Sequence, residues 1–304
     1  MIKYRAVLLI TLFISLCASV PFSYASLGAG GVEWGTVPAD TVSPWTLEFR
    51  GQLNGSQASF RNWEQGGVNT VALTASTNFN ALYRRGNWGY NLDTRLVYGQ
   101  AKVDDDFRKT EDEIKIRNSF RYFLEDDRWS VVGSVNFISQ FDEGLDRSRE
   151  FAVSKFMAPA YLTETIGISF SPTSSLSAEF GASARQTFVL TSDSTGAANV
   201  RTTFRERYGL RADQSVKNEL GFSLLVRYDK EILENVRYIG SIETFSNASQ
   251  RPDRSDFTFN NELIGRINNY LNTTFRFTML YNEDVSKKLQ LRQTFSVGLS
   301  VRFI

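Results

Sequence analysis

Few side chains of this sequence could carry out covalent chemistry. The chain has no histidine, and Cys17 is its one cysteine. Histidine is the commonest catalytic base, and both membrane-embedded phospholipases and triad hydrolases with a serine nucleophile depend on it. A hydrolase built on loop carboxylates is the remaining enzymatic alternative, but a solvated acidic surface explains the same residues better, so we predict no enzyme. These carboxylates are Asp104, Asp105, Asp106, Asp142, Glu143, Asp146 and Glu150.

The same carboxylates are poor metal ligands. Clustered acids suit Ca²⁺, but Asp104, Asp105 and Asp106 are consecutive and lack the alternating spacing of a dedicated loop site. No zinc-ligand pattern is present, so we expect neither a metal nor a cofactor. The formal net charge is only +1, which gives no electrostatic reason to expect nucleic acid as a partner.

Arginine is the charged residue whose spacing is most informative. Arginines recur on the polar positions of segments in which polar and apolar residues alternate, and we predict that they line a lumen as fixed charges: Arg95, Arg117, Arg121, Arg185, Arg227, Arg266, Arg276 and Arg292. Arg84, Lys115, Arg237 and Arg302 share this face, against six acids: Asp93, Glu179, Glu219, Asp229, Glu243 and Glu262. Twelve cations against six acids leave an excess of six, which would attract carboxylates, phosphates or acidic sugars.

The elements that position these arginines are β-strands with two faces. From Leu289 to Phe303 every second residue is apolar except Gln293, and the residues between them are polar or glycine. Such alternation over more than the 9 to 11 residues needed to cross a bilayer predicts a transmembrane strand. About twelve such segments occur, at 44–58, 69–84, 87–103, 112–125, 128–141, 159–171, 174–190, 216–230, 235–247, 255–268, 271–283 and 287–304.

The connections between these strands alternate between tight turns and longer polar loops, as in outer-membrane barrels. We therefore predict an all-β fold, a transmembrane antiparallel up-and-down barrel with short periplasmic turns and long outer loops. The segment from Phe204 to Leu210 is interpreted as an outer loop or a strand extension, because a thirteenth strand would make the count odd. Both termini then face the periplasm.

The N-terminus resembles a secretory signal. Lys3 and Arg5 precede an apolar run, and Ser23 and Ala25 provide the small residues of a cleavage site. The alternative, an uncleaved anchor helix, is disfavoured because Pro21 interrupts a short core. We predict a signal peptide over residues 1–25, a periplasmic segment over 26–43 and a barrel over 44–304, located in the bacterial outer membrane.

Aromatic residues provide a second line of argument for a membrane. They lie beside the proposed short turns, where amphipathic rings would sit at the level of the lipid headgroups. The alternative, a soluble β-sandwich or lipocalin-like barrel with an aromatic core, fits less well, because so many long amphipathic strands exceed the usual soluble sheet. The residues are Tyr83, Trp88, Tyr90, Tyr122, Trp129, Phe170, Tyr228, Tyr238, Tyr270 and Phe303.

Four short motifs give the chain a resemblance to a known family. They are Asn62 to Gly67 (NWEQGG), Phe107 to Ile114 (FRKTEDEI), Ser154 to Leu162 (SKFMAPAYL) and Lys230 to Val236 (KEILENV). In this order they resemble the outer-membrane barrels of the Domain of Unknown Function 3078 family. The resemblance implies a bacterial outer-membrane protein and no established activity. Ile304 departs from the aromatic last residue that is usual in such barrels and that serves the outer-membrane assembly machinery.

The loops and the lumen together lead to a functional hypothesis. Trp63, Lys155 and Phe156 lie in outer loops, where they could constrict the lumen, pack the loop or contact lipid phosphates. We predict a porin-like passive channel for small polar or anionic solutes, with outer-membrane lipids and the assembly machinery as partners. The alternative is a closed structural or binding barrel that presents its outer loops to envelope components. The sequence is compatible with a monomer or an oligomer.

Overall fold

The computed structural model describes residues 43–58, 70–103, 106–145, 151–195, 202–251, 254–282 and 284–303. The predicted signal peptide, nearly all of the 26–43 segment and Trp63 lie outside these ranges.

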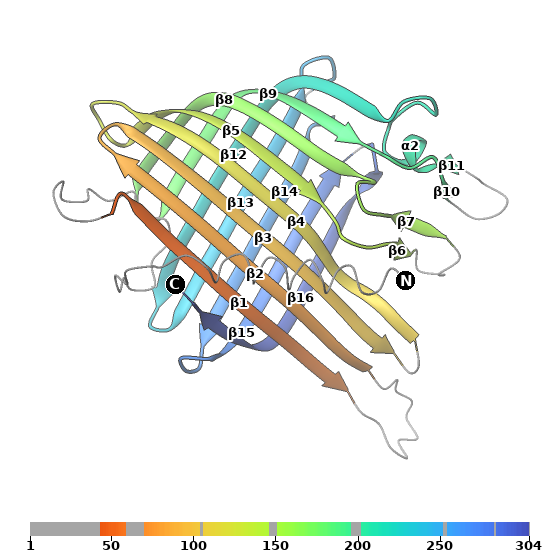
Figure 1. Cartoon of the computed structure of the whole chain (residues 1–304), viewed down its shortest axis with the longest axis horizontal. Coiled ribbons are helices and arrows are strands. Elements are labelled where there is room, and N and C mark those ends of the chain that lie inside the picture. Colours follow the sequence, from red (N-terminus) through yellow and green to blue (C-terminus); the bar gives the residue numbers. More distant parts are fainter. Residues whose placement is uncertain are drawn as a thin grey trace.

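Twelve long antiparallel strands close into one barrel, as predicted (Figure 1). Each strand pairs with the next long strand along the chain, and the last pairs with the first. The strands are β1 (Trp45–Ala58), β2 (Thr70–Arg85), β3 (Trp88–Val103), β4 (Asp106–Phe123), β5 (Trp129–Ser139), β8 (Ala160–Thr173), β9 (Leu176–Phe188), β12 (Val216–Leu233), β13 (Val236–Asn247), β14 (Asp256–Arg266), β15 (Leu271–Asn282) and β16 (Ser286–Arg302).

One strand differs from the sequence prediction in a way that matters for the lumen. β4 begins at Asp106, six residues before the predicted start at residue 112. Its register against β3 shifts where Gly99 pairs with Glu111 and Gln100 pairs with Lys109. This irregularity interrupts the strict alternation from which the start was predicted.

The outer face of the barrel is apolar. Along β16 the side chains of Leu289, Leu291, Phe295 and Leu299 are each more than half exposed, whereas Gly298 between them is buried. Exposed apolar residues at every second position form a face that is suited to lipid. Among the described residues, no helix combines the length and the apolar composition needed to cross a membrane.

Aromatic rings gather at the end of the barrel that carries the short turns. Ring centroids lie 5.0 Å apart for Trp88 and Tyr122 and 4.4 Å apart for Trp129 and Phe170. The first strand starts at this end and the last strand finishes there, because Trp45 pairs with Tyr83 and Arg302 pairs with Arg50. The rings therefore gather at the short-turn end, as predicted, and the first and last strands start and finish at that same end.

Short elements lie in the connections at the opposite end (Figure 1). They are β6 (Gly144–Leu145), β7 (Ala152–Ser154), β10 (Ser194–Thr195), β11 (Thr202–Thr203) and the helix α2 (Phe204–Arg207). The segment from Phe204 to Leu210 is thus part of a loop, as predicted, and not a strand extension. The loop turns helical because the Thr203 and Glu206 side chains form a capping box at its start.

Candidate functional site

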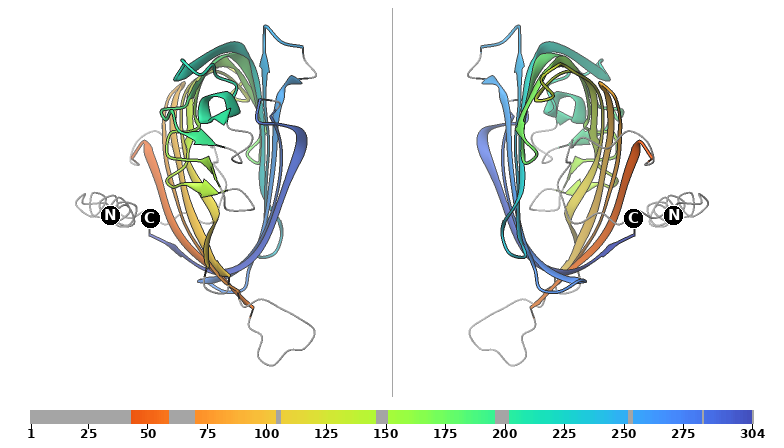
Figure 2. Two further views of the ribbon diagram at one scale, coloured as in Figure 1. Left: turned by 90° about the vertical axis from the view of Figure 1, so that its right-hand side faces the viewer. Right: turned by 90° about the vertical axis from the view of Figure 1, so that its left-hand side faces the viewer.

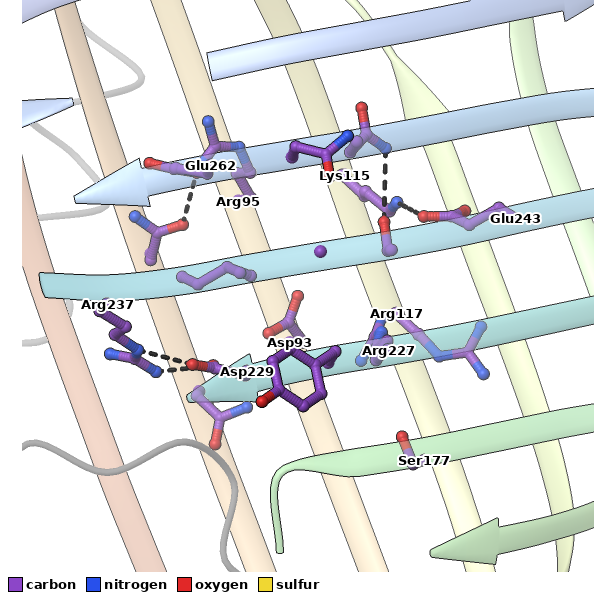
Figure 3. Close-up of a pocket in the computed structure, with 18 of the residues that line it drawn as sticks. Asp93, Arg95, Lys115, Arg117, Ser177, Arg227, Asp229, Arg237, Glu243 and Glu262 are labelled. Carbon is purple, nitrogen blue, oxygen red and sulfur yellow. Dashed lines mark hydrogen bonds and ion pairs between the residues drawn. The ribbon is translucent and has the colours of Figure 1, made fainter. Parts of the chain in front are cut away.

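The interior of the barrel holds a charged cavity of about 400 Å³ (Figure 3). Its basic lining residues are Arg50, Arg95, Lys115, Arg117, Arg121, Arg227, Arg237, Arg276 and Arg292. Its acidic lining residues are Glu48, Asp93, Glu111, Asp112, Glu113, Glu179, Asp229, Glu243 and Glu262. Nine cations face nine acids, so the predicted excess of six positive charges is wrong for this cavity. The prediction left out Glu48 and the three acids that follow the irregularity in β4.

Six of the eight arginines predicted for the lumen line this cavity: Arg95, Arg117, Arg121, Arg227, Arg276 and Arg292. Arg266 lines a second cavity of about 420 Å³ beside the short turns. Arg185 lines neither cavity; it pairs with Asp256, and its guanidinium lies 3.8 Å from the centre of the Phe245 ring.

Several ion pairs cross the lumen from β4. Lys115 reaches Glu243 on β13 at 2.7 Å, and Glu111 pairs with Arg276 on β15 at 3.2 Å. In the order of strands around the barrel, β13 and β15 lie roughly opposite β4. These pairs therefore connect facing walls and narrow the space between them.

Two buried arginines share one carboxylate. Arg117 and Arg121 on β4 both pair with Glu179 on β9, the first at 2.5 Å. The side chains of Arg121 and Glu179 are each 7% exposed. Charges removed from water in this way need a partner, because an unpaired buried charge is costly.

Three lining charges have no such partner among the described residues. The side chains of Arg227, Arg292 and Asp93 make no direct ion pair or hydrogen bond with any described residue, although all three line the cavity and Arg227 interacts electrostatically with Glu179 and Glu243. Figure 3 shows Arg227 and Asp93 among the paired side chains of the cavity. A solute could therefore contact these three groups without first breaking an ion pair.

Outer loops form an apolar cluster at the far end of the barrel, which we name the outer cap. Its buried members are Ala158, Val189, Phe204, Tyr208 and Leu210, and Ala152 and Val285 pack against them. The view from this end shows α2, β6 and β7 within the outline of the barrel (Figure 2). The outer cap thus covers part of the outer mouth.

Of the predicted outer-loop residues, Lys155 lies beside the outer cap and pairs with two acids of the outer loops, which together form the polar edge of the cap. Its ammonium group lies 2.8 Å from Asp193 and 3.2 Å from Glu143. Phe156, in contrast, is 59% exposed. Lys155 therefore holds two loop carboxylates, a role that the sequence did not reveal.

The FRKTEDEI motif also has a structural role that sequence reasoning missed. The Asp112 carboxylate accepts hydrogen bonds from the backbone N–H groups of Phe141 and Asp142 at 2.8 and 2.9 Å. Lys109 pairs with Asp112 and donates to the Asp142 carbonyl, both at 2.8 Å. Tyr98 donates to the Asp142 carboxylate at 2.9 Å. The sequence offered one signal of this contact with the loop: the charged residues Lys109 and Asp112, which lie three apart near the irregular start of β4.

The chain is similar to several solved structures and to one family model. No curated protein matches the sequence. Among solved structures, the translocator domain of the autotransporter NalP from Neisseria meningitidis is 13% identical, with a TM-score of 0.38 over 87% of this chain and 90% of that one. An outer membrane channel from Pseudomonas putida F1 is 8% identical, with a TM-score of 0.42 over 90% and 99%. The NanC porin is 10% identical, with a TM-score of 0.35 over 84% and 98%.

Scores below 0.5 carry no conclusion about function. The family comparison is more specific, because residues 56–145 match the family model described as "Protein of unknown function (DUF3078)". This segment includes the FRKTEDEI motif and the NWEQGG motif. The resemblance predicted from the sequence is confirmed, and the chain is an outer-membrane β-barrel that is similar to the DUF3078 family over these residues.

Proposed function

We propose that the barrel is a passive channel for small polar solutes, with a modest preference for anions. The observation that carries the proposal is a pair of adjoining, largely polar cavities inside the barrel. The central cavity and the cavity at the short-turn end share six lining residues: Arg50, Ser174, Ser175, Asp229, Arg237 and Ile264. Together they extend from the periplasmic mouth to the level of Asp112.

The unpaired charges supply the preference. Arg227 and Arg292 are two cations that form no direct ion pair with a described carboxylate, against Asp93 as one acid without a direct ion pair. Fixed charges of one sign in a narrow lumen concentrate ions of the other sign. Arg95, Arg117, Arg121 and Arg276 are held by acids, so in this proposal they set the width of the lumen more than its charge. We assign no covalent chemistry to these residues.

The outer cap favours a second candidate, a closed barrel that presents its loops to envelope components. Phe204 and Val189 in this cluster are fully buried. A cap that never opens would leave the lumen accessible from the periplasm alone.

Single-channel conductance in a planar bilayer under a KCl gradient tests the proposal. We expect current with a reversal potential that shows weak anion preference. Arg227→Glu should shift the reversal potential toward cations, because it converts an unpaired lumenal cation into an acid. Arg211→Glu is the matched control, since that side chain is 74% exposed in an outer loop.

One result would count against the channel, and another against the role of Arg227 in its selectivity. If both the wild type and a variant with a weakened outer cap, Phe204→Ala, are silent, the closed barrel is the better description. If current flows but the two charge reversals have equal effects, Arg227 does not face the conducting path.

A further inference from the structure

Neighbouring strands of the barrel are paired over unequal lengths. β1 and β16 close it through six residue pairs, from Arg50 with Arg302 to Gly55 with Val297. Every other neighbouring pair of barrel strands has at least ten. Along Ser286–Ser296, β16 is bonded to β15 on one edge and to no described strand on the other. We name this stretch the seam gap.

Side chains on the lumenal face of the seam gap are exposed. Arg292 lines the central cavity and is nevertheless exposed, and Lys288 and Gln290 on the same face are exposed too. Thr278, which pairs with Arg292 on β15, also lines the cavity but is partly buried. In Figure 2 the dark blue β16 and the orange β1 approach each other only at the lower edge of the barrel.

The height of the seam gap follows from strand geometry. Arg292 lies ten residues before Arg302, the last residue of β16. At about 3.3 Å per residue and a tilt of about 40°, Arg292 is about 25 Å above the periplasmic end of the strand. The apolar band of such barrels is also about 25 Å tall, so the seam gap lies near the boundary between hydrocarbon and the outer headgroups.

A polar row connects the seam gap with the periplasmic side. Laterally paired residues on six successive strands all line the cavity: Ser177, Arg227, Ser241, Asn260, Thr278 and Arg292. Ser177 follows the first residue of β9, beside a short turn, whereas Arg292 is at the seam gap. With strands about 4.8 Å apart, Arg227 and Arg292 are about 19 Å from each other along the row.

We propose that the seam gap is a lateral portal that admits a single-chain amphiphile with an anionic headgroup from the outer leaflet into the lumen. Unpaired backbone groups are tolerated at membrane depth where they line a water-filled cavity, so the portal is polar. Arg292 has no described partner and supplies the positive charge for the headgroup. On the outer face, Leu291 and Phe295 are 63% and 68% exposed, next to where the alkyl chain would remain in the bilayer.

The portal rests on the proposed function only in using the same lumen, and it can be tested without ion flow. Cys17 is the chain's one cysteine, in the predicted signal peptide, so single cysteines can be introduced. In nanodiscs, a maleimide attached to a lipid headgroup should label Gln290→Cys at least about tenfold faster than Thr278→Cys, because thiol labelling requires access. Lys288→Cys is a second reporter if Gln290→Cys does not fold, as judged by its heat-modifiable gel shift. Equal, slow labelling of the seam and control positions would overturn the portal, whatever the conductance.

Competition then tests the chemical class. Dodecyl phosphate should slow the labelling of Gln290→Cys, whereas dodecyl maltoside and inorganic phosphate should not. When Arg292→Gln is combined with Gln290→Cys, dodecyl phosphate should no longer protect the cysteine from labelling. Protection by the maltoside to the same extent would refute the anionic headgroup, and protection by inorganic phosphate alone would refute the amphiphile.

Discussion

At the scale of single residues, Glu179 is the side chain on which the interior charges depend most. It neutralises Arg117 and Arg121, whose side chains are 11% and 7% exposed. Glu179→Gln should destabilise the barrel by about 3 to 5 kcal/mol, because it removes the carboxylate that two buried guanidinium groups share. The thermal midpoint of the heat-modifiable gel shift measures this. Asp93→Asn is the control, since Asp93 has no partner among the described residues, and equal midpoints for the two variants would contradict the prediction.

Alternation predicts which face a residue occupies, but not which residue it meets. It placed Arg117, Arg227 and Arg292 on the inner face, and the structure finds all three lining the cavity. That Arg117 pairs with Glu179 while Arg227 and Arg292 form no direct ion pair with a described acid depends on the width and flattening of the barrel. The three-dimensional path of the wall determines these pairs, and residue spacing along one strand contains no information about it.

At the scale of elements, the outer cap depends on one ring. Phe204 is fully buried, and Phe204→Ala should destabilise the cap by about 3 to 5 kcal/mol through lost burial and the cavity that remains. The barrel itself should stay folded, because its strands do not require the cap, so the channel current should rise while the gel shift is unchanged. Phe156→Ala is the matched control, since that ring is 59% exposed. A current unchanged by both variants would show that the cap does not limit conductance.

The polar edge of the cap should respond to pH. The hydrogen bond with Asp193 raises the pKa of Lys155, and the same bond lowers the pKa of Asp193. The raised pKa of Lys155 stabilises the folded loop below the ordinary lysine value of 10.5, and this stabilisation is lost as pH rises through the folded-state pKa. The lowered pKa of Asp193 stabilises the folded loop above the ordinary aspartate value of 3.8, and this stabilisation is lost as pH falls through the folded-state pKa. Current should therefore increase below about pH 3.8 and above about pH 10.5. Lys155→Gln should remove this dependence, and an unchanged profile in that variant would assign it elsewhere.

The elements show where sequence reasoning succeeds. The twelve strands follow from period two, and most predicted boundaries lie within three residues of the observed ones. The start of β4 was missed because the irregular register opposite Gly99 removes the alternation. α2 was not predicted, although Thr203 and Glu206 have the spacing of a capping box that announces a helix start.

At the scale of the whole molecule, closure of the barrel depends on a glycine in the last strand. Gly298 pairs with Asn54 on β1 and with Asn272 on β15. Because Gly298 has no side chain, polar groups of the flanking strands meet across β16: Gln52 on β1 donates to Asn272 on β15 at 3.2 Å. The even strand count predicted that the first and last strands would pair, but not that so few residue pairs would join them.

Gly298→Val should therefore prevent closure. A Cβ atom at this position would collide with the Asn54 side chain and would lie 2.8 Å from the Leu53 carbonyl oxygen, a backbone atom that cannot move without opening the pairs between β1 and β16. Since these six pairs and the adjoining hydrogen bond from the Phe303 N–H to the Phe49 carbonyl hold β1 to the last strand, we expect refolded protein without the compact, heat-modifiable band. Gly133→Val on β5 is the matched control, because a Cβ atom there meets nothing within 4 Å. If both valine variants run as compact barrels, contacts other than this short pairing hold the wall closed, and the seam gap would then be no weaker than the rest of the barrel.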